Sequence, residues 1–228
     1  MGFSKIKNTI SKILKLPVIS VVLDHTDDGN RLYRAFTRQH PRYLIIKQKT
    51  IGVAIIQLGD FKIPEAFTAS VNGKNSAAYF SRKATRAGYT FKAINPNEMT
   101  DAIFEINNSA GSRQGREMDD SYKKKMSNYP VNENNLFFGV FKDNVLVSYL
   151  WVVKSGELAL INRLLGHAEH LNDGIMYFMV TSYVENEIKQ KGSTRFVMYD
   201  TFFGAGDGLK MFKSRCGFNS YRVKWIQS

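Results

Sequence analysis

The sequence predicts an α/β (α+β) protein whose central sheet is mixed, mostly antiparallel, and flanked by helices. Short runs rich in β-branched and aromatic residues recur between turn signals, which is typical of strands. One longer stretch, Ile175–Lys191, carries its apolar residues at near-helical spacing instead. Strands are expected before and after this helix, so they should be parallel neighbours joined by one crossover.

The first half of the chain alternates between the two kinds of element. Turn residues separate the apolar runs, and Gly88 suits the end of a helix. We expect strands over Val18–Leu23, Tyr43–Lys47, Ile51–Leu58 and Tyr89–Ile94. We expect helices over Asn30–Gln39, Asn75–Gly88, Glu98–Asn108 and Met118–Ser127, with Asn97 as the N-cap of the third.

The second half predicts a three-stranded meander followed by two helices and two further strands. The turn Lys142-Asp143-Asn144 separates the first two strands of the meander. The long helix should begin after Asp173 as N-cap and end at Gly192. The strands are expected over Leu136–Phe141, Val145–Val153, Glu157–Leu165, Arg195–Tyr199 and Tyr221–Trp225, and a second helix over Asp207–Arg215.

Composition narrows the class of protein. The 228 residues are 43% hydrophobic, enough for a buried core without disulfides. No apolar run is long enough to span a bilayer, and the use of a single cysteine is typical of a reducing compartment, so we expect a cytoplasmic protein. The single cysteine, Cys216, excludes an intrachain disulfide, and because no Cys/His cluster has zinc spacing we expect no metal. The net charge of +12 predicts an anionic partner.

Residues 1–17 predict a separate N-terminal element ahead of a single domain over residues 18–228. Phe3, Ile6 and Ile10 recur at helical spacing among lysines, which is the pattern of a basic amphipathic helix, and Pro17 ends it. Two interpretations remain open. Residues 1–16 can anchor the protein to the anionic inner face of a membrane, or the helix can pack on its own domain.

Two motifs carry a resemblance to a known family. Tyr199-Asp200, Gly204-Ala205-Gly206, Gly208-Leu209 and Phe212-Lys213 resemble the signature of the Fem-type peptidyltransferases and their relatives in the GNAT superfamily of N-acyltransferases. Ser81–Tyr89 is similar to a helix that those proteins carry upstream of this core. The resemblance covers roughly residues 75–228 and implies a GNAT-like acyl-CoA N-acyltransferase fold.

The resemblance also implies where an acyl-CoA donor would bind, with acetyl-CoA expected first. Strands that diverge after the meander would present backbone N–H groups to the donor, and the N-terminus of the long helix would face its pyrophosphate. Lys213 stands four residues before the closing Gly217. At this position, many GNAT enzymes carry a tyrosine that acts as the general acid. The donor-binding residues implied are Leu164, Leu165, Gly166, Asn172, Asp173, Gly174 and Lys213.

Acyl transfer to an amine also needs a proton acceptor and an acceptor site. His167 and His170 are candidate bases because imidazole titrates near neutral pH, and Asp200 is a third candidate at the carboxyl end of a strand. Each of them can equally be a surface loop or turn residue. Arg113 and Arg116 in a glycine-rich loop suit a phosphate or carboxylate, and Tyr122 and Tyr199 complete the candidate acceptor site.

We favour an enzyme that transfers an acyl group from acyl-CoA to an amine of a sugar or a lipid-linked cell-envelope precursor. A GNAT-shaped scaffold without activity at the membrane is one alternative, and a nucleic-acid-binding protein is another. Nucleic acid is not the expected partner, because the basic groups are scattered and no nucleic-acid-binding motif occurs. Fem-type aminoacyl transfer is the less favoured reaction, since a two-domain Fem enzyme needs a longer chain.

Overall fold

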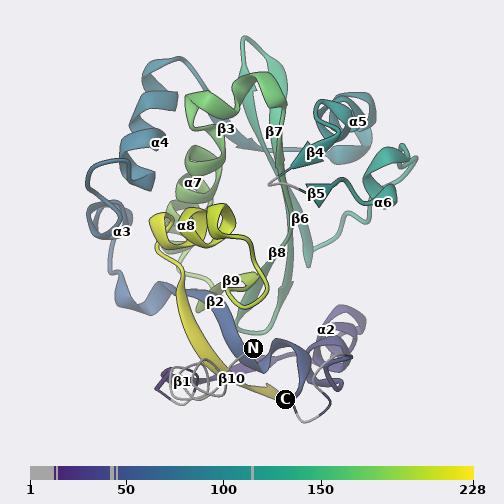
Figure 1. Ribbon diagram of the computed structural model, residues 1–228, viewed down its shortest axis with the longest axis vertical. Coiled ribbons are helices and arrows are strands. Elements are labelled where there is room, and N and C mark those ends of the chain that lie inside the picture. The colour runs from purple at the N-terminus through teal and green to yellow at the C-terminus, as the bar shows by residue number, and fades with distance from the viewer. Residues whose placement is uncertain (1–12, 14, 42–43, 45, 114–115) are drawn as a thin grey trace, which may run out of the picture.

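A computed structural model describes residues 1–228 except 1–12, 14, 42–43, 45 and 114–115, and it builds the chain around an eight-stranded sheet (Figure 1). The strand order is β1-β10-β2-β9-β8-β7-β6-β3. The strands are β1 (Val18–Leu23), β2 (Ile51–Gln57), β3 (Thr90–Ala93), β6 (Asn135–Lys142), β7 (Val145–Ser155), β8 (Leu158–Gly166), β9 (Phe196–Thr201) and β10 (Asn219–Gln227). A separate two-stranded hairpin joins β4 (Ser112–Arg113) to β5 (Arg116–Glu117).

Helices cover both faces of the sheet (Figure 1). On one face, α3 (Pro64–Ser70), α4 (Ala77–Arg86) and α7 (Ile175–Gln190) share the largest apolar core, and α8 (Asp207–Arg215) packs beside them. On the other face, α2 (Asp27–Thr37) and α5 (Thr100–Asn108) lie over separate apolar clusters. Short elements complete the fold: α6 (Asp120–Lys123) and the 3-10 turns η1 (Gln48–Thr50), η2 (Leu58–Asp60), η3 (Pro96–Glu98) and η4 (Ala168–Asp173).

The structure confirms the mixed α/β sheet, the meander β6–β8 and the crossover through α7. β8 and β9 are parallel, as the strand–helix–strand order predicts. Strand β1 was expected, but its parallel pairing with the C-terminal β10 was not. That pairing brings both ends of the described chain to one edge of the sheet.

Three local predictions were wrong. Asn97 lies inside η3 and binds the backbone of Tyr129 with its amide, so Met99 precedes α5. Helical structure within Met118–Ser127 is confined to α6. Asp173 ends η4, and Gly174 in the left-handed conformation is the residue that precedes α7.

Two further sequence predictions fall partly or wholly on residues that are not described. Residues 1–12 and 14 lie outside the described part of the chain, so the amphipathic N-terminal helix stays a prediction. The strand predicted over Tyr43–Lys47 is absent at its described residues: Leu44 lies in a turn, Ile46 in a bend, and Lys47 forms only an isolated bridge with Gln39. Within the described ranges, no helix is both long and apolar enough to cross a membrane.

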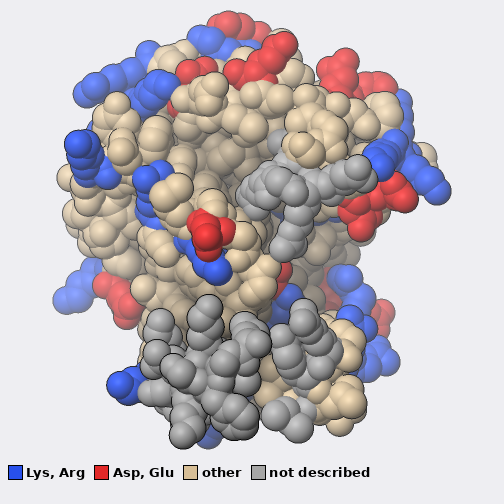
Figure 2. Space-filling model, viewed as in Figure 1, with Lys and Arg blue, Asp and Glu red and all other residues tan. Residues whose placement is uncertain are grey.

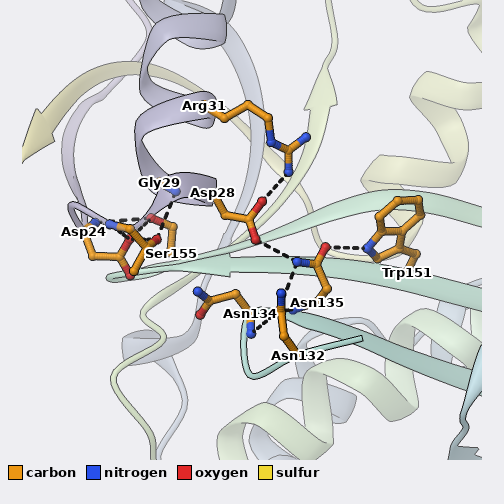
Figure 3. A network of polar contacts seen from close by, with 10 residues as sticks. Asp24, Asp28, Gly29, Arg31, Asn132, Asn134, Asn135, Trp151 and Ser155 are labelled. Carbon is orange, nitrogen blue, oxygen red and sulfur yellow. Dashed lines mark hydrogen bonds and ion pairs between the residues drawn. The ribbon is translucent and has the colours of Figure 1, made fainter. Parts of the chain in front are cut away.

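A polar network fixes the start of α2 against the meander (Figure 3). Asn135 is buried, and its Nδ2 donates to Asp28 Oδ2 at 2.7 Å while its Oδ1 accepts from Trp151 Nε1 at 3.0 Å. Asp24 accepts from Ser155 Oγ and from the Gly156 backbone N–H. Buried polar groups that are fully hydrogen-bonded hold one geometry, because any other arrangement leaves them unsatisfied.

Asp24 is expected to make the fold sensitive to acid. Burial raises the pKa of Asp24, but hydrogen bonds from Thr26, Ser155 and Gly156 outweigh it and hold the pKa below its ordinary value. Stability from a lowered carboxyl pKa is present above the unfolded value and is lost as the pH falls through the folded one. Asp24→Asn should therefore unfold more easily at pH 7, by about 1–2 kcal/mol.

The free-energy difference between the wild type and Asp24→Asn should shrink below about pH 4, because the unfolded chain then takes up a proton that the folded carboxylate still resists. Urea denaturation of both proteins at pH 7, 5 and 3.5 measures this. A difference that stays constant over that range would show that the carboxylate charge is not what holds Ser155 and Gly156.

Candidate functional site

A bulge in β8 separates this strand from its parallel neighbour. β8 and β9 pair only where Leu158–Leu160 face Phe196–Met198. On the other edge, Ile161 pairs with Val152 and Arg163 with Trp151, which leaves Asn162 as an extra residue in β8. A bulged strand bends and twists more strongly, so β8 turns away from β9 at this point. Asn162 is exposed although it lies in the middle of a central strand.

The predicted donor-binding residues of β8 lie beyond this divergence. Leu164, Leu165 and Gly166 are buried and pair with Leu150, Tyr149 and Ser148 of β7. β9 pairs with β8 no farther than Leu160. The expected separation of the two strands is thus present, and we call the space between β8 after Leu160 and β9 after Met198 the β8–β9 gap.

Lys213 of α8 is fully buried beside the end of β9. Its Nζ donates to the carbonyl oxygen of Thr201 at 2.7 Å and lies 5.0 Å from the centre of the Tyr199 ring. Burial disfavours the charged ammonium and lowers the pKa of Lys213 to about 8. A lysine amine with this pKa exists in both protonation states near neutral pH, which is the property that a proton-transfer group needs.

Asp200 lies next to this lysine and has a strained backbone. Its φ of 54° is in the left-handed region, which is unfavourable for residues other than glycine. The carboxylate forms an ion pair with Lys49, and the side chain is 57% exposed. The charge of Asp200 raises the pKa of Lys213 and the charge of Lys49 lowers it, both less strongly than burial does. Asp200 and Lys49 therefore shift the pKa of the Lys213 amine in opposite directions.

Two of the predicted acceptor residues, Tyr122 and Tyr199, lie beside Arg163 and Lys213 respectively. Tyr122 of α6 stacks under the guanidinium of Arg163, which lies 4.5 Å from the ring centre. Burial raises the pKa of Tyr199, and the nearby Tyr122 and Asp200 raise it further. Tyr199 and Lys213 thus belong to one neighbourhood at the end of β9, while Tyr122 lies against β8 through Arg163. Arg113 and Arg116 lie in the β4–β5 hairpin, and residues 114–115 between them are not described.

The candidate bases His167 and His170 lie in a different place, in the η4 turn before α7, at the top of Figure 1 and apart from α8. His170 Nδ1 is 2.7 Å from the hydroxyl of Tyr89, and that hydroxyl donates to Asp173 Oδ2 at 2.7 Å. The histidines and Asp200, grouped from the sequence as candidate bases, thus belong to separate parts of the structure.

The start of α7 is packed against α4. Lys83 Nζ donates to the carbonyl of Asn172 at 2.7 Å and lies 3.5 Å from Asp173 Oδ1. The hydrogen bond from Tyr89 and the contact with Lys83 hold the pKa of Asp173 below its ordinary value, so its carboxylate is ionised. Phe80 contacts Gly174 so closely that a Cβ there would meet its side chain at 2.8 Å. An ionised carboxylate therefore lies next to the start of α7, where the sequence predicts a pyrophosphate, but it does not cap the helix.

A surface groove on α4 adjoins this region and is basic. It is lined by Tyr79, Arg82, Lys83 and Arg86. Figure 2 shows Lys and Arg side chains gathered over the α4 side of the molecule. The basic residues of this groove can be read from the sequence. That the groove lies next to η4 is seen only in the structure, where Lys83 contacts Asp173.

Sequence reasoning missed the burial of Lys213, the bulge at Asn162 and the contacts of Tyr89. The sequence indicated a packed helix at α8, because Met211 and Phe212 are apolar and a glycine-rich turn precedes them. It did not indicate that the Lys213 side chain is buried. Asn162 interrupts an apolar run in a predicted strand, and that interruption is the signal that could have indicated a bulge.

The chain was compared with protein families, curated proteins and solved structures. No protein-family model matches it, and no curated protein matches it in sequence. Among solved structures, FemX has a TM-score of 0.58 and 11% identity, covering 75% of this chain and 59% of FemX. The C-terminal DUF2156 domain of a putative lysylphosphatidylglycerol synthetase from Agrobacterium fabrum has a TM-score of 0.52 and 14% identity, covering 75% and 58%.

A tandem GNAT protein from the clavulanic acid biosynthesis pathway also matches, with a TM-score of 0.49 and 18% identity, covering 86% of this chain and 56% of that protein. The chain spans less than two thirds of the length of each of these structures. The likenesses to FemX and to the synthetase domain show that the chain shares their fold. That fold is the one that the sequence motifs predict.

Proposed function

We propose that this protein is an acyltransferase that uses the β8–β9 gap to join an acyl group to an amine. The observation that carries the proposal is Lys213, a fully buried amine whose pKa is lowered to about 8 and which lies at the carboxyl end of β9, just past the divergence. Burying a lysine is unfavourable for the fold. A chemical role for its proton explains why a lysine stands there.

The proposed reaction moves one proton through Lys213. The neutral amine of the acceptor attacks the acyl carbonyl carbon, and backbone N–H groups of β8 beyond Leu160 stabilise the oxyanion that forms. Lys213, neutral in a fraction of molecules near pH 8, takes the proton from the attacking nitrogen. As the bond from the acyl carbon to the leaving group breaks, Lys213 returns that proton to the leaving sulfur or oxygen.

Access to Lys213 requires movement of the segment after β9. The side chain has no exposed surface, and Phe202 and Tyr199 lie over its Nζ. The segment 202–206 contains Gly204 with a φ of 80°. Substrate binding must therefore displace this segment from the end of β9, as lids do in many enzymes. Displacement that follows substrate binding also keeps water from the acyl donor.

We propose acyl-CoA, with acetyl-CoA first, as the donor, and the basic groove on α4 as the place for its phosphates. Asp173 lies two residues before α7 with an ionised carboxylate, so a pyrophosphate at the start of that helix would be close to a negative charge. Arg82, Lys83 and Arg86 lie beside that position and supply the opposite charge. The same observation favours a second candidate, transfer from an aminoacyl ester, because that donor does not require a pyrophosphate at α7.

For the acceptor, we propose an amine of a sugar or of a lipid-linked cell-envelope precursor. Arg113 and Arg116 belong to the β4–β5 hairpin, and they would bind the acceptor's phosphate or carboxylate. Residues 1–16 would hold the protein at the anionic inner face of the membrane, where lipid-linked acceptors occur.

Transfer assays with defined donors test the proposal. The full chain is incubated with amino-sugar acceptors and either acetyl-CoA, a long-chain acyl-CoA or an aminoacyl ester, and the acylated product is quantified by mass spectrometry. We expect product from acetyl-CoA in wild type. Product from the aminoacyl ester alone would move the assignment to the second donor, and absence of product from every donor and acceptor would contradict an acyltransferase role.

The pH profile should respond in opposite directions to two substitutions beside Lys213. Asp200→Asn removes a charge that raises the pKa of Lys213, so the acidic limb of kcat/KM should move to lower pH. Lys49→Met removes a charge that lowers that pKa, so the limb should move to higher pH. Initial rates between pH 6 and 9.5 measure both shifts. Shifts of the same sign would show that Lys213 is not the titrating group.

A further inference from the structure

We propose that the η4 turn binds a divalent transition-metal ion of the zinc type through His167, Glu169 and His170. Each of these side chains offers one ligand atom, and the three atoms lie within 4.8 Å of one another. Bonds of about 2.1 Å to a tetrahedral ion place ligand atoms about 3.4 Å apart, so modest side-chain rotation closes the set. Two imidazoles and a carboxylate suit zinc with a water in the fourth position.

The 3-10 geometry of η4 is what brings the two histidines together. The backbone N–H of His170 donates to the carbonyl of His167 at 3.1 Å, which is the bond between residues i and i+3 that defines this turn. In a 3-10 turn, side chains at i and i+3 lie on the same side. The two rings are accordingly 5.9 Å apart, centre to centre.

His167 presents a buried nitrogen that has no partner. Its Nδ1 is inaccessible to solvent and forms no hydrogen bond with any described residue. Leaving a buried polar atom unsatisfied costs about 1–3 kcal/mol. The backbone on each side is tied down, because the His167 N–H donates to Val147 and the Ala168 N–H to Ser109. A metal ion bound at Nδ1 of His167 would give this nitrogen the partner that it lacks.

His170 is oriented for the same purpose by Tyr89 and Asp173. The Tyr89 hydroxyl has one proton, which it donates to Asp173, so His170 Nδ1 must carry the proton that it shares with Tyr89. The other ring nitrogen, Nε2, then keeps its lone pair for a metal. Histidine ligands in proteins are held in this way by a polar group on the second nitrogen, which fixes the tautomer and the ring.

The proposed ion would stabilise the turn between β8 and α7 and is separate from the amine chemistry of Lys213. Sequence spacing predicted no metal, because the chain has one cysteine and no zinc-finger pattern. The ligands here come from one short turn, and a tyrosine distant in the sequence orients one of them. The site therefore becomes visible only when the turn is folded.

Titration of the full chain with zinc tests the site. The protein is purified without a polyhistidine tag, treated with chelator, and titrated with ZnCl₂ by calorimetry and with CoCl₂ by visible absorption. We expect one ion per chain, a raised melting temperature with Zn²⁺, and the intense absorption of four-coordinate cobalt. MgCl₂ should have no effect, because magnesium prefers oxygen ligands.

Four substitutions at the site and one control make the test specific. Glu169→Gln, at an exposed position, should fold normally and bind at least tenfold more weakly, as should His167→Ala and His170→Ala. Tyr89→Phe should weaken binding about 10–100-fold while keeping every ligand. His25→Ala, an exposed histidine in another part of the chain, should bind as wild type does. No stoichiometric uptake, or equal loss in His25→Ala and His167→Ala, would overturn the site.

Discussion

Lys213→Met is expected to remove most of the acyl transfer while leaving the protein as stable as the wild type or more stable. Loss of a positioned proton-transfer group lowers a rate by about 10²–10⁴-fold. The amine is fully buried, and its pKa falls from the ordinary 10.5 to about 8 because the interior disfavours the charge. That shift corresponds to an unfavourable contribution of up to about 3 kcal/mol at pH 7. Methionine fills a similar volume without a charge.

The stability difference should depend on pH with a definite sign. A lowered lysine pKa gives stability that is complete above the unfolded pKa of 10.5 and is lost as the pH falls through about 8. The advantage of Lys213→Met should therefore be largest at pH 7 and should shrink toward pH 10.5. Urea denaturation at pH 7, 8.5 and 10 measures it, together with turnover at saturating donor.

Lys210→Met is the matched control for Lys213. Lys210 lies on the same helix, has a side chain that is 45% exposed, and pairs with Asp207 at the surface. Such pairs contribute about 1 kcal/mol or less, so this variant should keep both activity and stability. Full turnover in Lys213→Met would contradict the proposed chemistry. A clear loss of stability in Lys213→Met at pH 7 would contradict the idea that the buried amine is unfavourable for folding.

Gly29→Ala is expected to destabilise the protein although it places the best helix former in a helix. Alanine exceeds glycine by about 1 kcal/mol at an ordinary helix position. At Gly29, however, a Cβ would lie 2.2 Å from the backbone oxygen of Asp24 and 2.7 Å from Ser155 Oγ. Backbone atoms cannot rotate away, so α2 would have to shift from the network of Figure 3. We expect a net loss of about 2–4 kcal/mol.

Gly208→Ala, at a glycine in α8, is expected to stabilise the protein instead. Gly208 lies in the first turn of α8, and a Cβ there would meet nothing within 4 Å. Alanine should therefore stabilise this helix by about 0.5–1 kcal/mol. Thermal and urea denaturation of both variants compare the two positions directly. If Gly29→Ala stabilises the protein as Gly208→Ala does, the close approach of Asp24 and Ser155 to α2 is contradicted.

Much of the sheet could be predicted because strand and helix patterns are local. β1 matches its predicted range of Val18–Leu23, and α8 matches Asp207–Arg215. The crossover that makes β8 and β9 parallel followed from the order of elements. The helix α3, Pro64–Ser70, was missed because it is short and its one buried apolar anchor, Phe67, gives no periodic signal.

The candidate site was less predictable because it depends on contacts between distant segments. The sequence indicated Lys213, Tyr199 and Asp200, but as neighbours in a motif, with no indication that the lysine is buried or that Lys49 approaches Asp200. Likewise, the long loop before α7 predicted an open phosphate site. In the structure, Tyr89 and Lys83 hold that loop in place through contacts with Asp173. Because these residues are far from Asp173 in the sequence, local patterns do not predict the contacts.

An NMR titration would measure the group on which the proposed chemistry depends. Lysine side chains labelled with ¹³C at Cε are followed from pH 6 to 11, and the resonance absent from Lys213→Met is assigned to Lys213. We predict that this resonance has a midpoint near pH 8, below the ordinary lysine value of 10.5, and that acetyl-CoA perturbs it. A Lys213 midpoint above 10, with no response to any acyl donor, would contradict its role as the proton-transfer group of the β8–β9 gap.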